Sequence, residues 1–277
     1  DKRVMVMGSI KLALAQKLLL VYLAFLIIYW ILLQISCEQT SIWNYAYSVS
    51  FSLVPLIGGL IGILLSRSWG FLSSAIGKAV FYISLGLFFW GLGSMIFAYY
   101  NIFLNNPAPY PSLADASYIL CWPLWGLGII NLSHATGAKF SLRKVKGRLF
   151  LFVIPLILVV LSYYLLVVVA RAGSVSDFSG GFKVFFDLAY PIGDVVILSL
   201  AVLIYGLSFN YLGGKFKYTI IILLLGFVFN YIADFIFSYT TTTGTFYVGN
   251  FGDLIFTSAL FMLTFGVLGF NRSLLEQ

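Results

Sequence analysis

The feature that most limits the fold of this chain is a series of long apolar runs. A helix needs about twenty apolar residues to cross the hydrocarbon core of a bilayer, and eight runs of about that length occur here. A run such as LFLFVIPLILVVLSYYLLVVVA is apolar on every face, whereas the strands of a membrane β-barrel alternate in hydrophobicity. The sequence therefore predicts an all-α integral membrane protein, an eight-helix transmembrane bundle with spans at residues 18–36, 45–65, 79–100, 113–132, 149–170, 184–210, 218–239 and 249–270.

The basic residues predict how this bundle is oriented. Lys and Arg are retained on the cytoplasmic side of a membrane, and an N-terminus on that side leaves only Arg171 and Lys183 of the sixteen outside. We therefore expect a multi-pass protein of the cell membrane with both termini in the cytoplasm. The formal net charge of +7 then comes from inward-facing loops beside anionic lipid, so the lipid bilayer is the expected partner and no nucleic acid is implied.

Three segments follow from this topology. Residues 1–17 are predicted to be a cytoplasmic or interfacial N-terminal segment, residues 18–271 the transmembrane domain, and residues 272–277 a cytoplasmic tail. The chain begins without Met and stops soon after its last span, which suggests that it is a fragment and that the tail starts an output domain lying beyond it.

Two predicted helical hairpins resemble each other. LFFWGLGSMIFAYY followed by NPAPYPSLADASYIL is similar to FVFNYIADFIFSYT followed by FYVGNFGDLIFTS. Because the two hairpins run in the same direction, duplication would make them parallel repeats about an axis along the membrane normal. The alternative is chance similarity between apolar sequences.

Seven of the nine acidic residues are predicted outside the membrane or in its outer half. Asp115 and Asp253 follow Ser112 and Asn250 by three residues, the spacing of a helix N-cap, so helix capping explains both without a ligand. Asp194 and Asp234 are predicted to lie inside the membrane. An ionised carboxylate is costly there, and intramembrane acids usually face the bundle interior or a wet cavity.

Helical spacing suggests that these acids belong to one polar site. Asp187 and Asp194 are seven residues apart, and Asn230 precedes Asp234 by four, so each pair shares a helix face. If these faces meet, they line an outward-facing cavity for a small cationic or amphipathic ligand, with aromatic walls that favour a cation. The alternative is that the polar faces only hydrogen-bond between closely packed helices. The candidate ligand-binding residues are Asp194, Asp234, Asp115, Asp253, Asp187, Asn230, Tyr118, Trp122, Trp90 and Tyr190.

The sequence gives no sign of a cofactor, a metal or an enzymatic activity. Its one histidine, His134, is predicted at the cytoplasmic end of a span, which rules out bis-histidine haem and a histidine-based zinc site. No predicted span contains a lysine that could carry retinal. Phosphate-loop, HExxH and GxSxG motifs are also missing, so we expect no catalytic residues.

The stretch PYPSLADASYILCWPLWGLG resembles a motif of multispan input domains of prokaryotic signal transducers, which precede histidine kinase or diguanylate cyclase outputs. That motif, P-x-PS-x-AD-x-x-Y-x-x-x-x-P-x-x-x-G, is carried by Pro109, Pro111, Ser112, Ala114, Asp115, Tyr118, Pro123 and Gly126 or Gly128. DLAYPIGDVVILSLAV and GNFGDLIFTSAL resemble later YP-x-GD and G-x-x-x-D elements, carried by Tyr190, Pro191, Gly193 and Asp194 and by Gly249 and Asp253. The resemblance covers the predicted spans three to eight and implies a sensory role, although no kinase or cyclase follows Gln277.

We therefore expect a membrane sensory or ligand-binding domain that signals through its last helix to an output domain or partner. A cation- or proton-coupled small-molecule transporter would use the same buried acids and repeats, but it needs a path that also opens inward. A non-catalytic subunit of a larger membrane complex is the third alternative.

Overall fold

The computed structural model describes residues 12–36, 38–104, 111–135, 145–169, 181–208 and 216–271, and in this part of the chain every regular element is helical. The α4–α5 and α7–η2 pairs each form one rod, which gives eight helical rods. The elements are α1 (Leu14–Ser36), α2 (Ile42–Ser68), the 3-10 turn η1 (Phe71–Ser73), α3 (Ala75–Phe103), α4 (Leu113–Ile119), α5 (Cys121–Ala135), α7 (Val145–Ser162), the π-helical η2 (Tyr163–Val169), α8 (Gly181–Ser208), α9 (Lys217–Thr242) and α10 (Phe251–Leu268).

Six of the eight rods are long and apolar enough to cross a membrane, namely α1, α2, α3, α4–α5, α9 and α10. The other two contain shorter apolar helices, Phe152–Leu165 in α7–η2 and Ile192–Ile204 in α8. The chain is therefore a multi-pass membrane protein by helix length and hydropathy. Each predicted span coincides with one rod to within a few residues, because hydropathy alone locates such helices.

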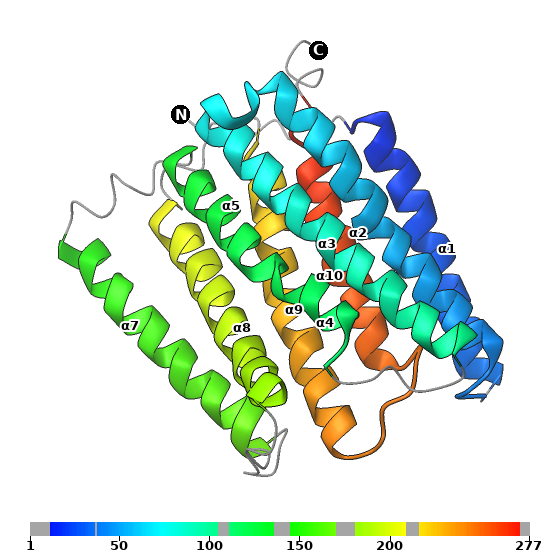
Figure 1. Cartoon of the computed structure of the whole chain (residues 1–277). Coiled ribbons are helices and arrows are strands. Elements are labelled where there is room, and N and C mark those ends of the chain that lie inside the picture. The colour runs from blue at the N-terminus through cyan, green and yellow to red at the C-terminus, as the bar shows by residue number, and fades with distance from the viewer. Residues whose placement is uncertain are drawn as a thin grey trace, which may run out of the picture.

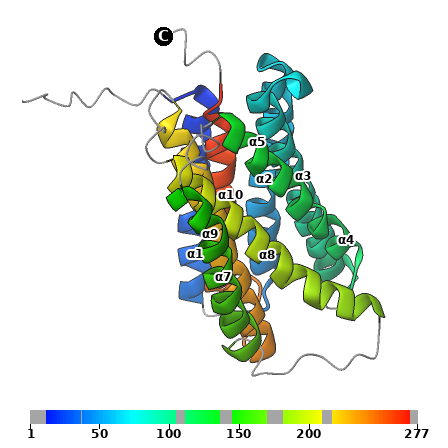
Figure 2. The same ribbon diagram turned by 90° about the vertical axis from the view of Figure 1, so that its left-hand side faces the viewer.

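The rods form a bundle in which successive rods along the chain run antiparallel (Figure 1). The most extensive packing joins α2 to α3, α9 to α10 and α3 to α5, and α10 also packs on α2. Two rods lie at the edges: α1 packs on α10 and α2, while α7 packs mainly on α8. Figure 2 shows that α8 runs obliquely to the other rods. The hairpin of α7 and α8 is thus the outer layer on one side of a tighter core.

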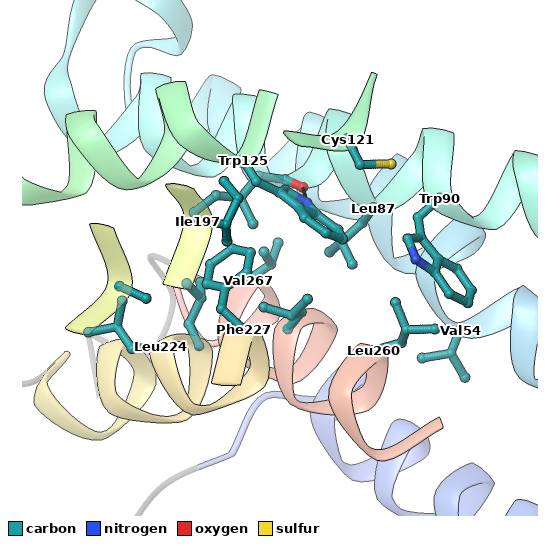
Figure 3. Close-up of a cluster of buried hydrophobic side chains, with 14 of the residues drawn as sticks. Val54, Leu87, Trp90, Cys121, Trp125, Ile197, Leu224, Phe227, Leu260 and Val267 are labelled. Carbon is teal, nitrogen blue, oxygen red and sulfur yellow. Dashed lines mark hydrogen bonds between the residues drawn. The ribbon is translucent and has the colours of Figure 1, made fainter. Parts of the chain in front are cut away.

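Glycine brings the central helices into backbone contact. A Cβ on Gly91 of α3 would lie 2.7 Å from the backbone nitrogen of Leu56 in α2, and one on Gly59 would lie 2.6 Å from the carbonyl oxygen of Ser84. Close approach of this kind gives membrane helices their van der Waals packing. Between α3, α5, α9 and α10 the bundle is filled by buried apolar side chains, among them Leu87, Trp125, Phe227 and Leu260 (Figure 3).

The two ends of the bundle differ in charge. The basic side chains that the structure describes, Lys17, Arg67, Lys78 and Lys217, belong to the start of α1, the end of α2 and the starts of α3 and α9. Hydrogen bonds of Gln16 to the carbonyl of Phe265, and of Trp69 to that of Phe270, bring these helix ends together. We call this the basic end; the carboxylates that the structure describes lie away from it. His134, in the last turn of α5, is exposed, as predicted.

Candidate functional site

Two carboxyl groups from different helices meet inside the bundle. Asp194 of α8 and Asp234 of α9 are in hydrogen-bonding contact, and we call them the acid pair. The indole Nε1–H of Trp122 in α5 donates to Asp194 Oδ1 at 3.2 Å, and the Asn230 amide nitrogen donates to Asp234 Oδ2 at 2.7 Å. Asp194 is 5% exposed, while Asp234 is partly exposed. The pair is therefore held by α5, α8 and α9 together, with one member still accessible.

Local sequence explains why these groups meet. Asn230 and Asp234 are one turn apart on α9, so their side chains adjoin. Gly193, which precedes Asp194, lets the Trp122 ring lie against the α8 backbone, because a Cβ there would come within 2.5 Å of Trp122 Cγ. Asp234 lies eight residues before Thr242, the end of α9, which places it about 12 Å inside the helix.

The cluster contains more hydrogen-bond acceptors than donors. Asn230 is only 5% exposed, and its Oδ1 has no hydrogen-bond partner. Two carboxyl groups in contact cannot both be ionised without strong repulsion, so the acid pair is expected to share one proton. The described Lys and Arg side chains all lie at the basic end and offer no counter-ion. A buried acceptor without a donor is costly, so this region is suited to a group that brings positive charge or N–H donors.

A second carboxylate ties α4 to α8. The Tyr190 hydroxyl of α8 donates to Asp115 Oδ1 at 2.6 Å, while Asp115 Oδ2 accepts from the backbone N–H and the hydroxyl of Ser112 at 2.7 and 2.9 Å. The predicted capping box is confirmed. The Tyr190 ring also meets the Trp122 ring edge to face, with centroids 4.8 Å apart. Asp115 is therefore connected through two aromatic side chains to the acid pair.

Asp253 occupies a different environment. Its Oδ2 accepts from the Gly249 backbone N–H at 2.6 Å, and its own N–H donates to Asn250 Oδ1 at 3.1 Å. The Nε1–H of Trp30 and the amide nitrogen of Gln34, both in α1, donate to the carbonyls of Asn250 and Gly249. The Asp253 carboxylate thus closes the start of α10, at a point where α1 is attached.

Tyr118 and Trp90 form an aromatic contact rather than hydrogen bonds to an acid. The Tyr118 hydroxyl bonds to Ser94 Oγ at 2.9 Å, and its ring lies 5.5 Å from that of Trp90. Trp90 also packs on Phe256 of α10 at 5.5 Å. Tyr118 therefore joins α4 to α3, and Trp90 joins α3 to α10.

The structure thus joins six of the candidate residues in one connected group: Asp194, Asp234, Asn230, Trp122, Tyr190 and Asp115. Asp187 lies on α8, but its side chain is outside the described residues. One contact near the site was not predicted: the Ser162 and Tyr231 hydroxyls bond at 2.8 Å and join α7 to α9. The sequence feature that could have indicated this contact is Ser162, the single serine in the apolar run VVLSYY.

An apolar groove lies away from the acids. It has a volume of about 480 Å³ and is lined by Leu156, Ile157, Val160, Leu161 and Tyr164. These side chains all belong to the α7–η2 rod at the edge of the bundle, so the groove suits lipid. The described residues contain no group of three His, Cys, Asp or Glu side chains that could hold a metal ion.

Comparison of this chain with protein-family models, with curated proteins and with solved structures finds no match. The resemblance to sensory input domains therefore extends only to the motifs that carry it. The geometry of the acid pair is therefore the main structural indication of function.

Proposed function

We propose that this chain is an eight-span membrane sensory domain, with both termini in the cytoplasm, that binds a small ligand from outside at Asp194, Asp234 and Asn230. The observation that carries the proposal is the meeting of two carboxyl groups from α8 and α9 beside an unpaired amide oxygen. Intramembrane acids of this kind usually mark a functional site. The gathering of the described basic side chains at the opposite end supports the orientation.

An apolar layer beneath the acid pair favours sensing over transport. One turn further toward the basic end, each of the three helices carries a large apolar side chain: Trp125 after Trp122, Ile197 after Asp194, and Phe227 before Asn230. All three belong to the same buried cluster (Figure 3), and the rings of Trp125 and Phe227 lie 5.4 Å apart. Among the described residues these side chains form an apolar layer directly beneath the acids. Such a layer supports binding of a ligand without its passage across the membrane.

The attachments of α8 provide a route for the signal. Trp122 and Tyr190 link α8 to the α4–α5 rod through Asp194 and Asp115, and a ligand that binds Asp194 changes how α8 is held against that rod. The acid pair also joins α8 to α9, which packs extensively on α10. A change in how α8 is held is thereby transmitted to α10, the last helix. For this to occur, the ligand must bind more tightly to one arrangement of α8 in the bundle than to the other.

The test is a binding screen with purified protein in lipid nanodiscs. Small cationic, neutral and anionic compounds are compared by the shift that each causes in the thermal unfolding midpoint. We expect a cationic compound to stabilise the wild type but not Asp234→Asn. Glu38→Gln is the matched control, because it removes one negative charge from an exposed residue between α1 and α2.

Two outcomes would reject the proposal. If every compound shifts the wild type and Asp234→Asn equally, the acid pair is not a binding site. If a bound compound is instead carried across the membrane of reconstituted liposomes, the protein is a transporter and the apolar layer opens.

A further inference from the structure

Three oxygen atoms of the acid pair and Asn230 accept no hydrogen bond from a described donor outside the acid pair itself. Trp122 occupies Oδ1 of Asp194 and Asn230 occupies Oδ2 of Asp234. Asp194 Oδ2 and Asp234 Oδ1 remain, and the buried Oδ1 of Asn230 is the third. Because the Asn230 amide nitrogen bonds to Asp234, its orphan oxygen lies at the same cluster.

Resting on the proposed function, we infer that this site takes a primary alkylammonium ion, whose three N–H groups donate to Asp194, Asp234 and Asn230. A primary ammonium has three donors and no acceptor, so it can replace the proton that the two acids share and also reach the unpartnered oxygen of Asn230. Hydrogen bonds to charged groups are the strong ones, and a water-poor site strengthens them further.

The surroundings restrict the rest of the ligand. Trp122 and Tyr190 stand edge to face beside the acids, and their rings favour a cation with an apolar substituent. The layer of Trp125, Ile197 and Phe227 beneath is apolar. The described residues offer no Lys or Arg near the acids to bind a ligand carboxylate. The site therefore selects a simple amine over a zwitterionic amino acid, which would bring a negative charge against two carboxyl groups.

A bare metal cation fits less well. Na⁺ and larger cations coordinate several oxygens, whereas two of the five oxygens here already accept N–H donors of the protein. An alkylammonium uses the remaining three and leaves the Trp122 and Asn230 hydrogen bonds in place. The cluster is thus better matched to directional N–H donors than to a coordination sphere.

The decisive experiment compares two probes on the wild-type protein in nanodiscs. n-Butylammonium and n-butyltrimethylammonium carry the same charge and the same chain, but only the first has N–H donors. We expect n-butylammonium to bind about tenfold more tightly or better, measured by isothermal titration calorimetry, because three charge-assisted hydrogen bonds are lost in the second. Glycine, a zwitterion with the same ammonium group, is expected to show no binding.

Two variants test whether the Asn230 oxygen accepts a hydrogen bond from the ammonium group. Asn230→Ala removes the orphan oxygen and should weaken n-butylammonium binding about tenfold while leaving n-butyltrimethylammonium unchanged. Ser238→Ala, two turns further along α9, is the matched control and should change neither. Because the two-probe comparison uses the wild type, it decides the matter even if Asn230→Ala does not fold.

The possible results distinguish failure of the ammonium assignment from failure of the proposed sensory function. Equal affinity for the two probes would overturn the ammonium assignment and keep a cation site governed by charge and aromatic rings. Absence of binding by both probes would also overturn it, and the wider compound screen would then decide on the sensory role alone. Binding that persists in Asp234→Asn would place the amine elsewhere and reject both.

Discussion

The buried acids of this protein fall into two regions that differ in one respect. At the start of α10, Asp253 accepts the backbone N–H of Gly249, and the helix start is complete with Asn250. Between α8 and α9, Asp194 and Asp234 contact each other, and a neighbouring amide oxygen accepts no hydrogen bond from the described residues. Both regions are buried and acidic, so burial of a carboxylate alone does not identify a site. The difference lies in whether the surrounding donors satisfy the acceptors.

The largest effect is expected at the start of α10, where the carboxylate of Asp253 already accepts a hydrogen bond. Asp253→Ala leaves the Gly249 N–H without its acceptor and removes a carboxylate from the positive end of α10. We expect the free energy of unfolding to fall by about 1–3 kcal/mol, measured by denaturant or thermal unfolding in detergent. Ligand binding at the acid pair should persist in the variant. An unchanged unfolding midpoint would show that Asp253 is not the cap that holds this helix start.

The next effect concerns the glycine that admits Trp122. In Gly193→Ala the new Cβ would stand 2.5 Å from Trp122 Cγ, so the indole must move away from Asp194. Overpacking of this kind costs about 1–3 kcal/mol of stability. We also expect the variant to bind n-butylammonium more weakly than the wild type does. Gly126→Ala is the matched control, since its Cβ would first meet Ile197 Cδ1 at 3.8 Å, an ordinary contact. Equal behaviour of the two variants would contradict the packing of Trp122 on α8.

A smaller effect is expected where α8 is attached to α4. Tyr190→Phe removes the hydroxyl that donates to Asp115 at 2.6 Å but leaves the Ser112 hydrogen bonds of the α4 cap. We expect a loss of about 1 kcal/mol and faster amide hydrogen exchange in α8. Tyr118→Phe, which loses only the bond to Ser94, should leave exchange in α8 unchanged. If both variants loosen α8 alike, Asp115 does not anchor it.

The sequence predicted the local features of both regions, and it offered the meeting of the acids only as a hypothesis. Hydropathy locates each rod, and the spacing from Ser112 to Asp115 predicts a cap that is confirmed, because both depend on neighbouring residues only. Which faces of the helices meet cannot be obtained in this way, since spans that are apolar all round have no periodic signal. The contact between Asp194 and Asp234 and the unpaired oxygen of Asn230 arise from the oblique packing of α8 on α9 and α5.

The smallest change in stability is expected for Asp234→Asn in the acid pair, although this substitution abolishes the proposed binding site. In Asp234→Asn the new amide can donate to Asp194 in place of the proton that the two acids share, so the contact keeps a hydrogen bond. The variant also removes one of two like charges, and we expect the free energy of unfolding to stay within about 1 kcal/mol of the wild type. Asp253→Ala, measured in the same way, should be clearly destabilised, because it removes the acceptor of the Gly249 backbone N–H. Strong destabilisation of Asp234→Asn would mean that the acid pair holds the bundle together as the cap does, and the distinction between the two regions would fail.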